Sequence, residues 1–212
     1  MPVMLSQMWD IKHGKEEEYI RFITDTYIPG VKYIGFYVAG GSYVAIGPRP
    51  RIIGQFTVDD LPTMEKRLKS EKFIDLNSQL LEYVEDYGTK VLESTGRIQV
   101  AKYPVQKNVW KIIQYFDLEP GKEDEYDSFM RNDYIPTFKS LGVMEFTGEW
   151  TVVHGDKPDI VTEFTGKSPS EACGMYADSE FLRITRILKT SLARNFSSRL
   201  LVSTERFEGL SL

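Results

Sequence analysis

The chain has 212 residues, of which 42% are hydrophobic and 13% aromatic, enough to fill the core of one large or two small domains. Its net charge of −5, without any basic block, argues against nucleic-acid binding. The segment from Met1 to Gln7 lacks the basic and long apolar regions of a signal peptide, and no apolar run approaches the roughly 20 residues that cross a bilayer. We therefore expect a cytoplasmic protein without nucleic-acid or membrane partners.

Cys173 is the only cysteine, so the chain cannot form an intrachain disulfide, which suits a reducing compartment. Because Cys173 falls in a predicted helix, we interpret it as a small apolar filler rather than a reactive thiol.

The first predicted element of each half is a strand, over residues 3–11 and 109–118. In residues 3–11 every second side chain is apolar except Gln7, and this period of two indicates β structure. The second half repeats the series as Trp110, Ile112, Gln114, Phe116 and Leu118.

A helix follows in each half. It begins after a Gly-Lys turn with a run of carboxylates, which favour the N-terminus of a helix. We expect Pro29 and the equivalent Pro136 to end these helices, because the residue before a proline avoids the helical conformation. The apolar residues at helical spacing are Tyr19, Phe22, Ile23 and Tyr27, then Tyr126, Phe129, Met130 and Tyr134.

Two strands come next, over residues 35–46 and 51–57, and over 142–153 and 159–165 in the second half. A second helical region follows, broken near Ser70 and Ser179, and a last strand closes each half. The order β-α-β-β-α-β is that of the ferredoxin-like fold, so the predicted class is α+β.

The two halves are copies of one unit. The motif GKEEEY at residues 14–19 returns as GKEDEY at 121–126, an offset of 107. After one inserted residue, placed at His154, Phe56 matches Phe164. We predict ferredoxin-like repeats at 1–103 and 104–212 that meet at Pro104. Helices on one face of each sheet leave the other face apolar, so we expect the two copies to cover each other as a pseudo-dimer, which could pair into a homodimer.

The GKEEEY helix start, the Gly35-Phe36 pair and the segments SEKF (70–73) and DSEF (178–181) together resemble the dimeric α/β-barrel superfamily, with its NIPSNAP-like and antibiotic-biosynthesis monooxygenase-like families. The resemblance implies that two sheets close into a barrel, here within one chain. Members include cofactor-free oxygenases, small-ring isomerases and haem enzymes, so the resemblance leaves the activity open.

The fused haem enzymes of this superfamily, the chlorite dismutase-like ones, use a histidine of the second half as axial ligand. This chain has no helix-borne histidine to match it, and its two histidines show no metal-ligand spacing. We therefore expect neither a cofactor nor a metal, and we expect His13 to face solvent.

Three residues of the second half form the predicted acid–base set: His154, Glu163 and Tyr134. His154 precedes a hairpin turn, where it is either a solvated turn residue or a proton acceptor or metal or haem ligand near a cavity mouth. Glu163 takes the place of Gln55 in the third strand; facing inward it would be a general base, and facing outward an ordinary surface carboxylate.

A second group of residues is predicted to line a substrate cavity: Gln7, Trp9, Tyr43, Gln114 and Trp150. A buried amide needs hydrogen-bond partners, so the two glutamines are either structural or polar anchors for a ligand. The aromatic residues are either core or cavity lining. Arg97 and Arg206 follow a Ser-Thr pair at the end of each repeat, where we expect structural pairing.

Two functions follow from these residues. The first is a small-molecule-binding enzyme, a cofactor-independent monooxygenase or isomerase acting on an aromatic or polyketide-like compound. The second is a non-catalytic binding or assembly protein whose barrel is filled by side chains; a haem protein is a more distant alternative. A cavity of several hundred Å³ would favour the first function and a packed barrel the second.

Overall fold

A computed structural model describes residues 2–98 and 107–204. Eight antiparallel strands close into one barrel in the order β1-β3-β2-β8-β5-β7-β6-β4. The strands are β1 (Val3–Ile11), β2 (Tyr37–Ile46), β3 (Ile52–Val58), β4 (Val84–Ser94), β5 (Trp110–Leu118), β6 (Glu145–His154), β7 (Ile160–Gly166) and β8 (Ala193–Ser203).

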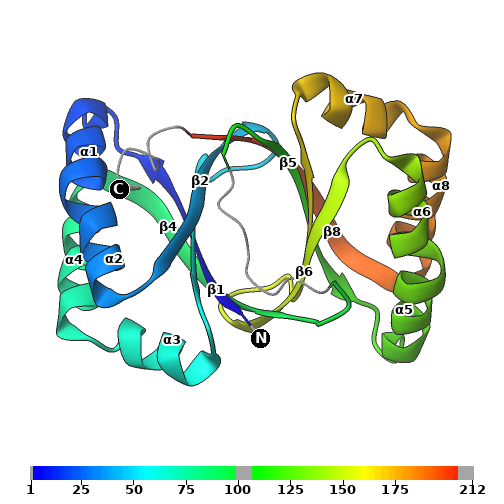
Figure 1. Ribbon diagram of the computed structural model, residues 1–212, viewed down its shortest axis with the longest axis horizontal. Helices are drawn as coiled ribbons and strands as arrows, with labels where there is room; N and C mark the ends of the chain where they lie inside the picture. Colours follow the sequence, from blue (N-terminus) through cyan, green and yellow to red (C-terminus); the bar gives the residue numbers. More distant parts are fainter. Residues whose placement is uncertain (1, 99–106, 205–212) are drawn as a thin grey trace.

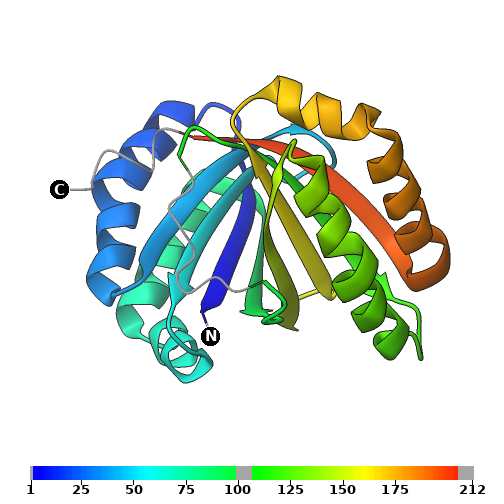
Figure 2. The same ribbon diagram turned by 45° about the vertical axis from the view of Figure 1, so that its right-hand side comes forward.

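The helices pack outside the barrel in two groups, one for each repeat (Figure 1). Figure 2 shows that both groups stay on the outer faces of the sheets. No helix among the described residues is long and apolar enough to span a bilayer. The helices are α1 (Glu16–Phe22), α2 (Ile28–Ile34), α3 (Leu61–Leu68), α4 (Glu71–Tyr83), α5 (Glu123–Phe129), α6 (Ile135–Leu141), α7 (Pro169–Ala177) and α8 (Ser179–Ile187).

The barrel closes at two seams between the repeats. The first repeat contributes the sheet β4-β1-β3-β2 and the second β8-β5-β7-β6. The edge strand β2 pairs with β8, and β4 pairs with β6. Each sheet alone would expose two unpaired edges, and closure removes all of them. The predicted α+β class, repeat order and mutual covering of the sheets are confirmed.

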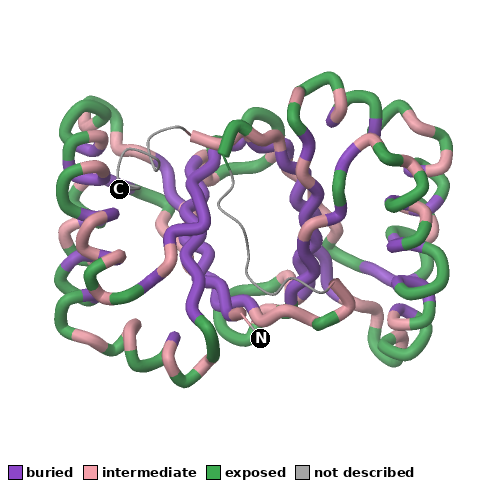
Figure 3. The backbone as a smooth tube through the Cα atoms, in the orientation of Figure 1, coloured by how far each residue is buried: buried purple, intermediate pink, exposed green. Residues whose placement is uncertain are grey.

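Alternation along each strand separates two kinds of buried environment. In β1, Leu5 and Trp9 pack against the helices of the first repeat, while Met4 and Met8 point into the barrel. The second repeat has the same arrangement. Figure 3 shows the resulting burial of the strands, while the outward faces of the helices are exposed. The protein therefore has two helix–sheet cores and a third core inside the barrel.

The expectation that Pro29 and Pro136 end the first helices is wrong. A wide π-helical turn, Ile23–Tyr27, precedes Pro29, and the Ile28 N–H donates to the Ile23 carbonyl five residues back. The proline then lies in the first turn of a new α-helical segment, where its missing N–H costs nothing. The helix ends instead at Gly35, whose φ of 98° is left-handed.

The second helical region is broken where the sequence predicts it. Ser70 accepts a hydrogen bond from the Phe73 N–H and begins α4. In the second repeat Asp178 accepts from the Phe181 N–H and begins α8, one residue before the predicted Ser179. Pro104 lies outside the described residues, so the domain boundaries stay a prediction.

The strand register places the inserted residue earlier in the second repeat than the sequence comparison does. Tyr37 pairs with Thr57 in the first repeat, and Glu145 pairs with Thr165 in the second. The offset is therefore already 108 at Glu145, so the extra residue lies between Gly142 and Glu145 rather than at His154, whose counterpart is Ile46.

The end of each repeat crosses to the other. The Thr95 N–H donates to the Glu149 carbonyl of β6 at 3.1 Å, and the Thr204 N–H donates to Gly41 of β2 at 2.8 Å. Arg97 contacts Asp127 at 2.8 Å and the buried Glu149 at 2.9 Å. The predicted structural pairing is thus observed for Arg97, while Arg206 lies outside the described residues.

We expect Arg97→Ala to lower the free energy of unfolding by about 2 to 3 kcal/mol, because it leaves the buried Glu149 carboxylate without its cation. Chemical denaturation of the full chain measures this. Arg131→Ala is the matched control, since Arg131 forms an exposed ion pair with the same Asp127 and its loss should have little effect. Equal effects of the two substitutions would contradict the role of Arg97 in joining the repeats.

Candidate functional site

A polar cluster lies at the centre of the barrel. The Lys111 Nζ donates to Gln55 Oε1 at 2.6 Å and lies 3.7 Å from Glu163 Oε1. Gln55 Nε2 donates to the same Glu163 oxygen at 2.7 Å, and Trp150 Nε1 donates to the other at 3.3 Å. Each of these side chains is at most 3% exposed. Glu163 therefore faces the barrel interior, which is one of the two orientations that the sequence left open.

The cluster exists once, although the repeat exists twice. At the offsets that relate the repeats, Lys111 corresponds to Met4 and Glu163 to Gln55. Burial lowers the pKa of Lys111, and the Glu163 carboxylate opposes that shift. Sequence reasoning missed Lys111, although its place in β5 on the face opposite Gln114 was a usable signal.

Apolar side chains fill the rest of the barrel around this cluster. They include Met4, Ile53, Leu92, Ile113, Tyr115, Val161 and Leu201, all buried. Together with the hydrogen-bonded polar side chains, they occupy the space that the sequence offers as a substrate cavity. This packing favours the alternative in which side chains fill the barrel interior. A small-molecule site is then expected outside the barrel.

The predicted polar anchors lie between sheet and helices. The Tyr27 hydroxyl donates to Gln7 Oε1, and the Tyr134 hydroxyl donates to Gln114 Oε1, both at 2.7 Å. Burial raises the pKa of Tyr134. Trp9 lies in the same layer of the first repeat, where its Nε1 donates to the Tyr19 hydroxyl at 2.9 Å. These contacts support the structural alternative for both glutamines.

The structure does not bring the predicted site residues together. Tyr134 contacts the helix-facing side of the second sheet, whereas Glu163 points into the barrel from the same sheet. His154 is exposed at the end of β6, and Tyr43 is 45% exposed on β2. Strand alternation is the reason, since neighbouring positions of one strand face different environments. The catalytic roles of His154, Glu163 and Tyr134 stay predictions.

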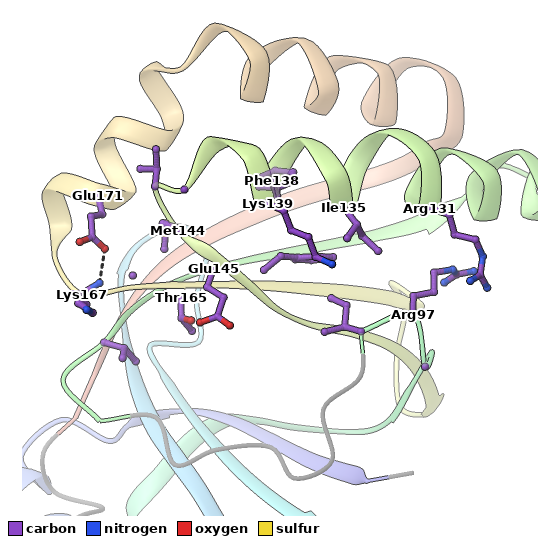
Figure 4. Close-up of a pocket in the computed structure, with 17 residues that line it drawn as sticks. Arg97, Arg131, Ile135, Phe138, Lys139, Met144, Glu145, Thr165, Lys167 and Glu171 are labelled. Atoms are coloured by element: carbon purple, nitrogen blue, oxygen red, sulfur yellow. Dashed lines mark hydrogen bonds between the residues drawn. The ribbon is translucent and has the colours of Figure 1, made fainter.

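A groove of about 980 Å³ opens in the second repeat between α6 and the strands β6 and β7 (Figure 4). Its apolar lining includes Ile135, Phe138, Met144 and Phe146. None of the predicted catalytic or cavity residues lines it. Among the described residues, its charged lining consists of Arg97, Arg131, Lys139, Lys167, Glu145 and Glu171.

The repeats differ in the side chain that lies over this position. In the first repeat Arg67 donates to the Gly35 carbonyl and lies over the Phe36 ring, so a Cβ at Gly35 would meet its guanidinium at 3.0 Å. Met175 takes the place of Arg67 in the second repeat, and a Cβ at Gly142 would meet nothing within 4 Å.

A second difference lies at the floor of the groove. Gly166 takes the place of Val58, and a Cβ there would meet Glu171 Oε2 at 2.8 Å and Met144 at 3.2 Å. A valine at this position, as in the first repeat, would displace these two groove-lining side chains.

Cys173 is not the buried filler that the sequence suggests. It is exposed on α7, where the helix turns it away from the core, and lines a smaller groove with Ile46, Tyr176 and Leu200. His13 faces solvent, as expected.

The described lining of the large groove offers no usual haem ligand. Histidine, cysteine and tyrosine are the usual proximal haem ligands, and none of the described residues that line the groove is one of these. Within residues 2–98 and 107–204, no cluster of three or more histidine, cysteine or carboxylate side chains is placed to hold a metal ion. Axial ligation therefore has no candidate donor of these types in the groove.

No protein-family model matches the chain, and no curated protein matches its sequence. Solved structures match over nearly its whole length. A "putative monooxygenase" from Lactobacillus acidophilus has a TM-score of 0.65 at 10% identity, over 95% of this chain and 93% of that one. An anthrone oxidase-like protein has a TM-score of 0.63 at 12% identity, over 96% and 91%. A mutant chlorite dismutase from Candidatus Nitrospira defluvii has 0.65 at 9%, over 98% and 93%. The matches show the fold, which is the dimeric α/β barrel that the sequence resemblance implies.

We expect Lys111→Met and Glu163→Gln each to lower the free energy of unfolding by about 3 to 5 kcal/mol, because each leaves one buried charge unpaired. The double variant carries the first-repeat residues at both positions and should lie within about 1 kcal/mol of the native protein. Urea unfolding of the four proteins completes a double-mutant cycle, with the exposed Lys139→Met as control. If the losses of unfolding free energy in the two single variants add up in the double variant, Lys111 and Glu163 are not coupled.

Proposed function

We propose that this protein binds a small aromatic or polyketide-like molecule in the groove of its second repeat and acts on it as a monooxygenase-like enzyme without a bound cofactor. The observation that supports the proposal is the groove itself, of about 980 Å³ with an aromatic and aliphatic floor. Ligand sites commonly measure about 300 to 1,000 Å³ and combine apolar walls with a few polar groups.

The names of two structural neighbours, a monooxygenase and an anthrone oxidase-like protein, agree with this activity. A shared fold is weak evidence for a shared function, so the proposal rests on the groove. Exposed on β6, Glu145 is a groove carboxylate that could accept a proton from a bound phenol or activated methylene. Oxygenation of anthrone, the model reaction, consumes one molecule of oxygen and yields anthraquinone and water.

The filled barrel favours a second candidate, a non-catalytic binding or assembly protein. In that case the central Lys111–Glu163 pair would serve only to join the repeats through its hydrogen bonds with Gln55, and the groove would have no small-molecule ligand. An isomerase in the same groove would change its substrate without consuming oxygen.

Fluorescence titration with anthrone, together with an oxygen electrode, tests the proposal. We expect saturable binding by the native protein and about tenfold or greater weakening in Met175→Arg, which restores the arginine that covers this position in the first repeat. Gly166→Val should also weaken binding, because its side chain would displace Glu171 and Met144 in the groove lining, and it adds no charge. Arg67→Met is the matched control in the first repeat and should leave anthrone binding in the second repeat unchanged.

Binding that survives both Met175→Arg and Gly166→Val would move the ligand out of the groove. A folded native protein that neither binds anthrone or related polycyclic phenols nor consumes oxygen with them would support the assembly protein instead. Circular dichroism of each variant verifies that it is folded.

A further inference from the structure

The helix–sheet layer of the first repeat contains a closed set of hydrogen bonds around the Gln7 amide. Gln7 Nε2 donates to the Tyr87 hydroxyl at 2.7 Å and to Asn77 Oδ1 at 3.1 Å. The Tyr87 hydroxyl donates in turn to Asn77 Oδ1 at 2.7 Å. This hydroxyl therefore accepts from the strand β1 and donates to the helix α4, and so connects the sheet to the helix.

The second repeat keeps the glutamine but changes its tyrosine partner. Gln114 takes the place of Gln7. Tyr87 lies two residues before the β4 partner of Gln7. Phe196 lies two residues before the β8 partner of Gln114, so it takes the place of Tyr87. The Phe196 ring is held by Phe116, on which it stacks with the ring centroids 6.0 Å apart, and it has no hydroxyl to offer Gln114.

The partner on the helix changes as well. The first hydrogen bonds to the caps of α4 and α8 come from the Phe73 and Phe181 N–H groups, an offset of 108. Thr185 therefore takes the place of Asn77, and its side chain is shorter by one heavy atom. Together the two exchanges remove a hydroxyl group and one further heavy atom from the space beside the glutamine.

Two polar groups of the second repeat have no partner at this place. Gln114 Oε1 accepts from the Tyr134 hydroxyl at 2.7 Å and from Thr162 Oγ1 at 3.2 Å. Among residues 2–98 and 107–204, however, Gln114 Nε2 has no hydrogen-bond acceptor, and the buried Thr185 Oγ1 has no partner either. Gln114 is only 1% exposed. Because an unpaired buried polar group loses its hydration without compensation, folded proteins nearly always pair it.

We infer that the second repeat binds a water molecule between Gln114 and Thr185, at the position that the Tyr87 hydroxyl has in the first repeat. The water accepts a hydrogen bond from Gln114 Nε2 and donates one to Thr185 Oγ1, and it connects β5 to α8. Buried waters in proteins typically occupy polar sites of this kind and pair groups that otherwise have no partner. The site is separate from the groove, whose described lining includes neither residue.

High-resolution crystal structures of the full chain and of two variants test the inference. The native protein should show a water peak within about 3.2 Å of both Gln114 Nε2 and Thr185 Oγ1. In Phe196→Tyr the new hydroxyl should replace this peak. Tyr87→Phe is the matched variant of the first repeat and should gain a water peak beside Gln7. Absence of the native peak, or its persistence next to the new hydroxyl in Phe196→Tyr, would overturn the inference.

Thr185→Val provides an independent measurement in solution, because valine has the shape of threonine without its hydroxyl and a similar helix propensity. If the hydroxyl binds the water, its removal breaks a hydrogen bond, and the urea midpoint of the full chain should fall. If the hydroxyl has no partner, its removal relieves an unpaired buried group, and the midpoint should rise. A midpoint that is unchanged or higher in Thr185→Val therefore contradicts the water site.

Discussion

A four-stranded sheet with helices on one face leaves its other face and both edges without partners, and the rest of this structure depends on how that is resolved. Each repeat provides what the other lacks. The seams between β2 and β8 and between β4 and β6 remove the sheet edges, and the two bare faces meet as the barrel interior. Burial of this face from water is the main driving force for joining the halves. Because both sheets are in one chain, their association does not depend on protein concentration.

Closure also decides where a ligand can bind. The barrel interior, which is the first place to seek a cavity in such a fold, is occupied by apolar side chains and by the hydrogen-bonded group of Lys111, Gln55, Glu163 and Trp150. A buried ion pair contributes little net stability, but it can specify which partners meet. Here Gln55 of one repeat contacts Lys111 and Glu163 of the other, an arrangement that two identical halves could not form.

Because the chain contains two copies of one unit, the second repeat can be compared directly with the first. The helix–sheet layers of the two repeats share their framework, including the π-helical turns Ile23–Tyr27 and Met130–Tyr134, each followed by an Ile-Pro pair, and the left-handed glycine at the end of the helix. Against this common framework, exchange of Arg67 for Met175 and of Val58 for Gly166 coincides with the groove. One repeat thus retains a covered helix end, while the other presents an opening beside α6. Divergence after duplication can create a site without disturbing the barrel interior, because Val58 and Met175 belong to the helix–sheet cores and not to the interior core.

The sequence alone determined the repeat, the order of strands and helices, and the need for the two sheets to cover each other, because periodicity and internal similarity are local properties of the chain. It also contained the alternation that assigns residues to the two sides of each strand. Only the tertiary structure decided which side is the barrel: Gln7 and Trp9 belong to the helix layer, while Glu163 points into the barrel, where Gln55 of the other repeat donates to it. The groove was likewise beyond sequence reasoning, since an open volume depends on which side chains from distant segments reach it, and the free space beside Gly142 is defined only once the segments around it are placed in the fold.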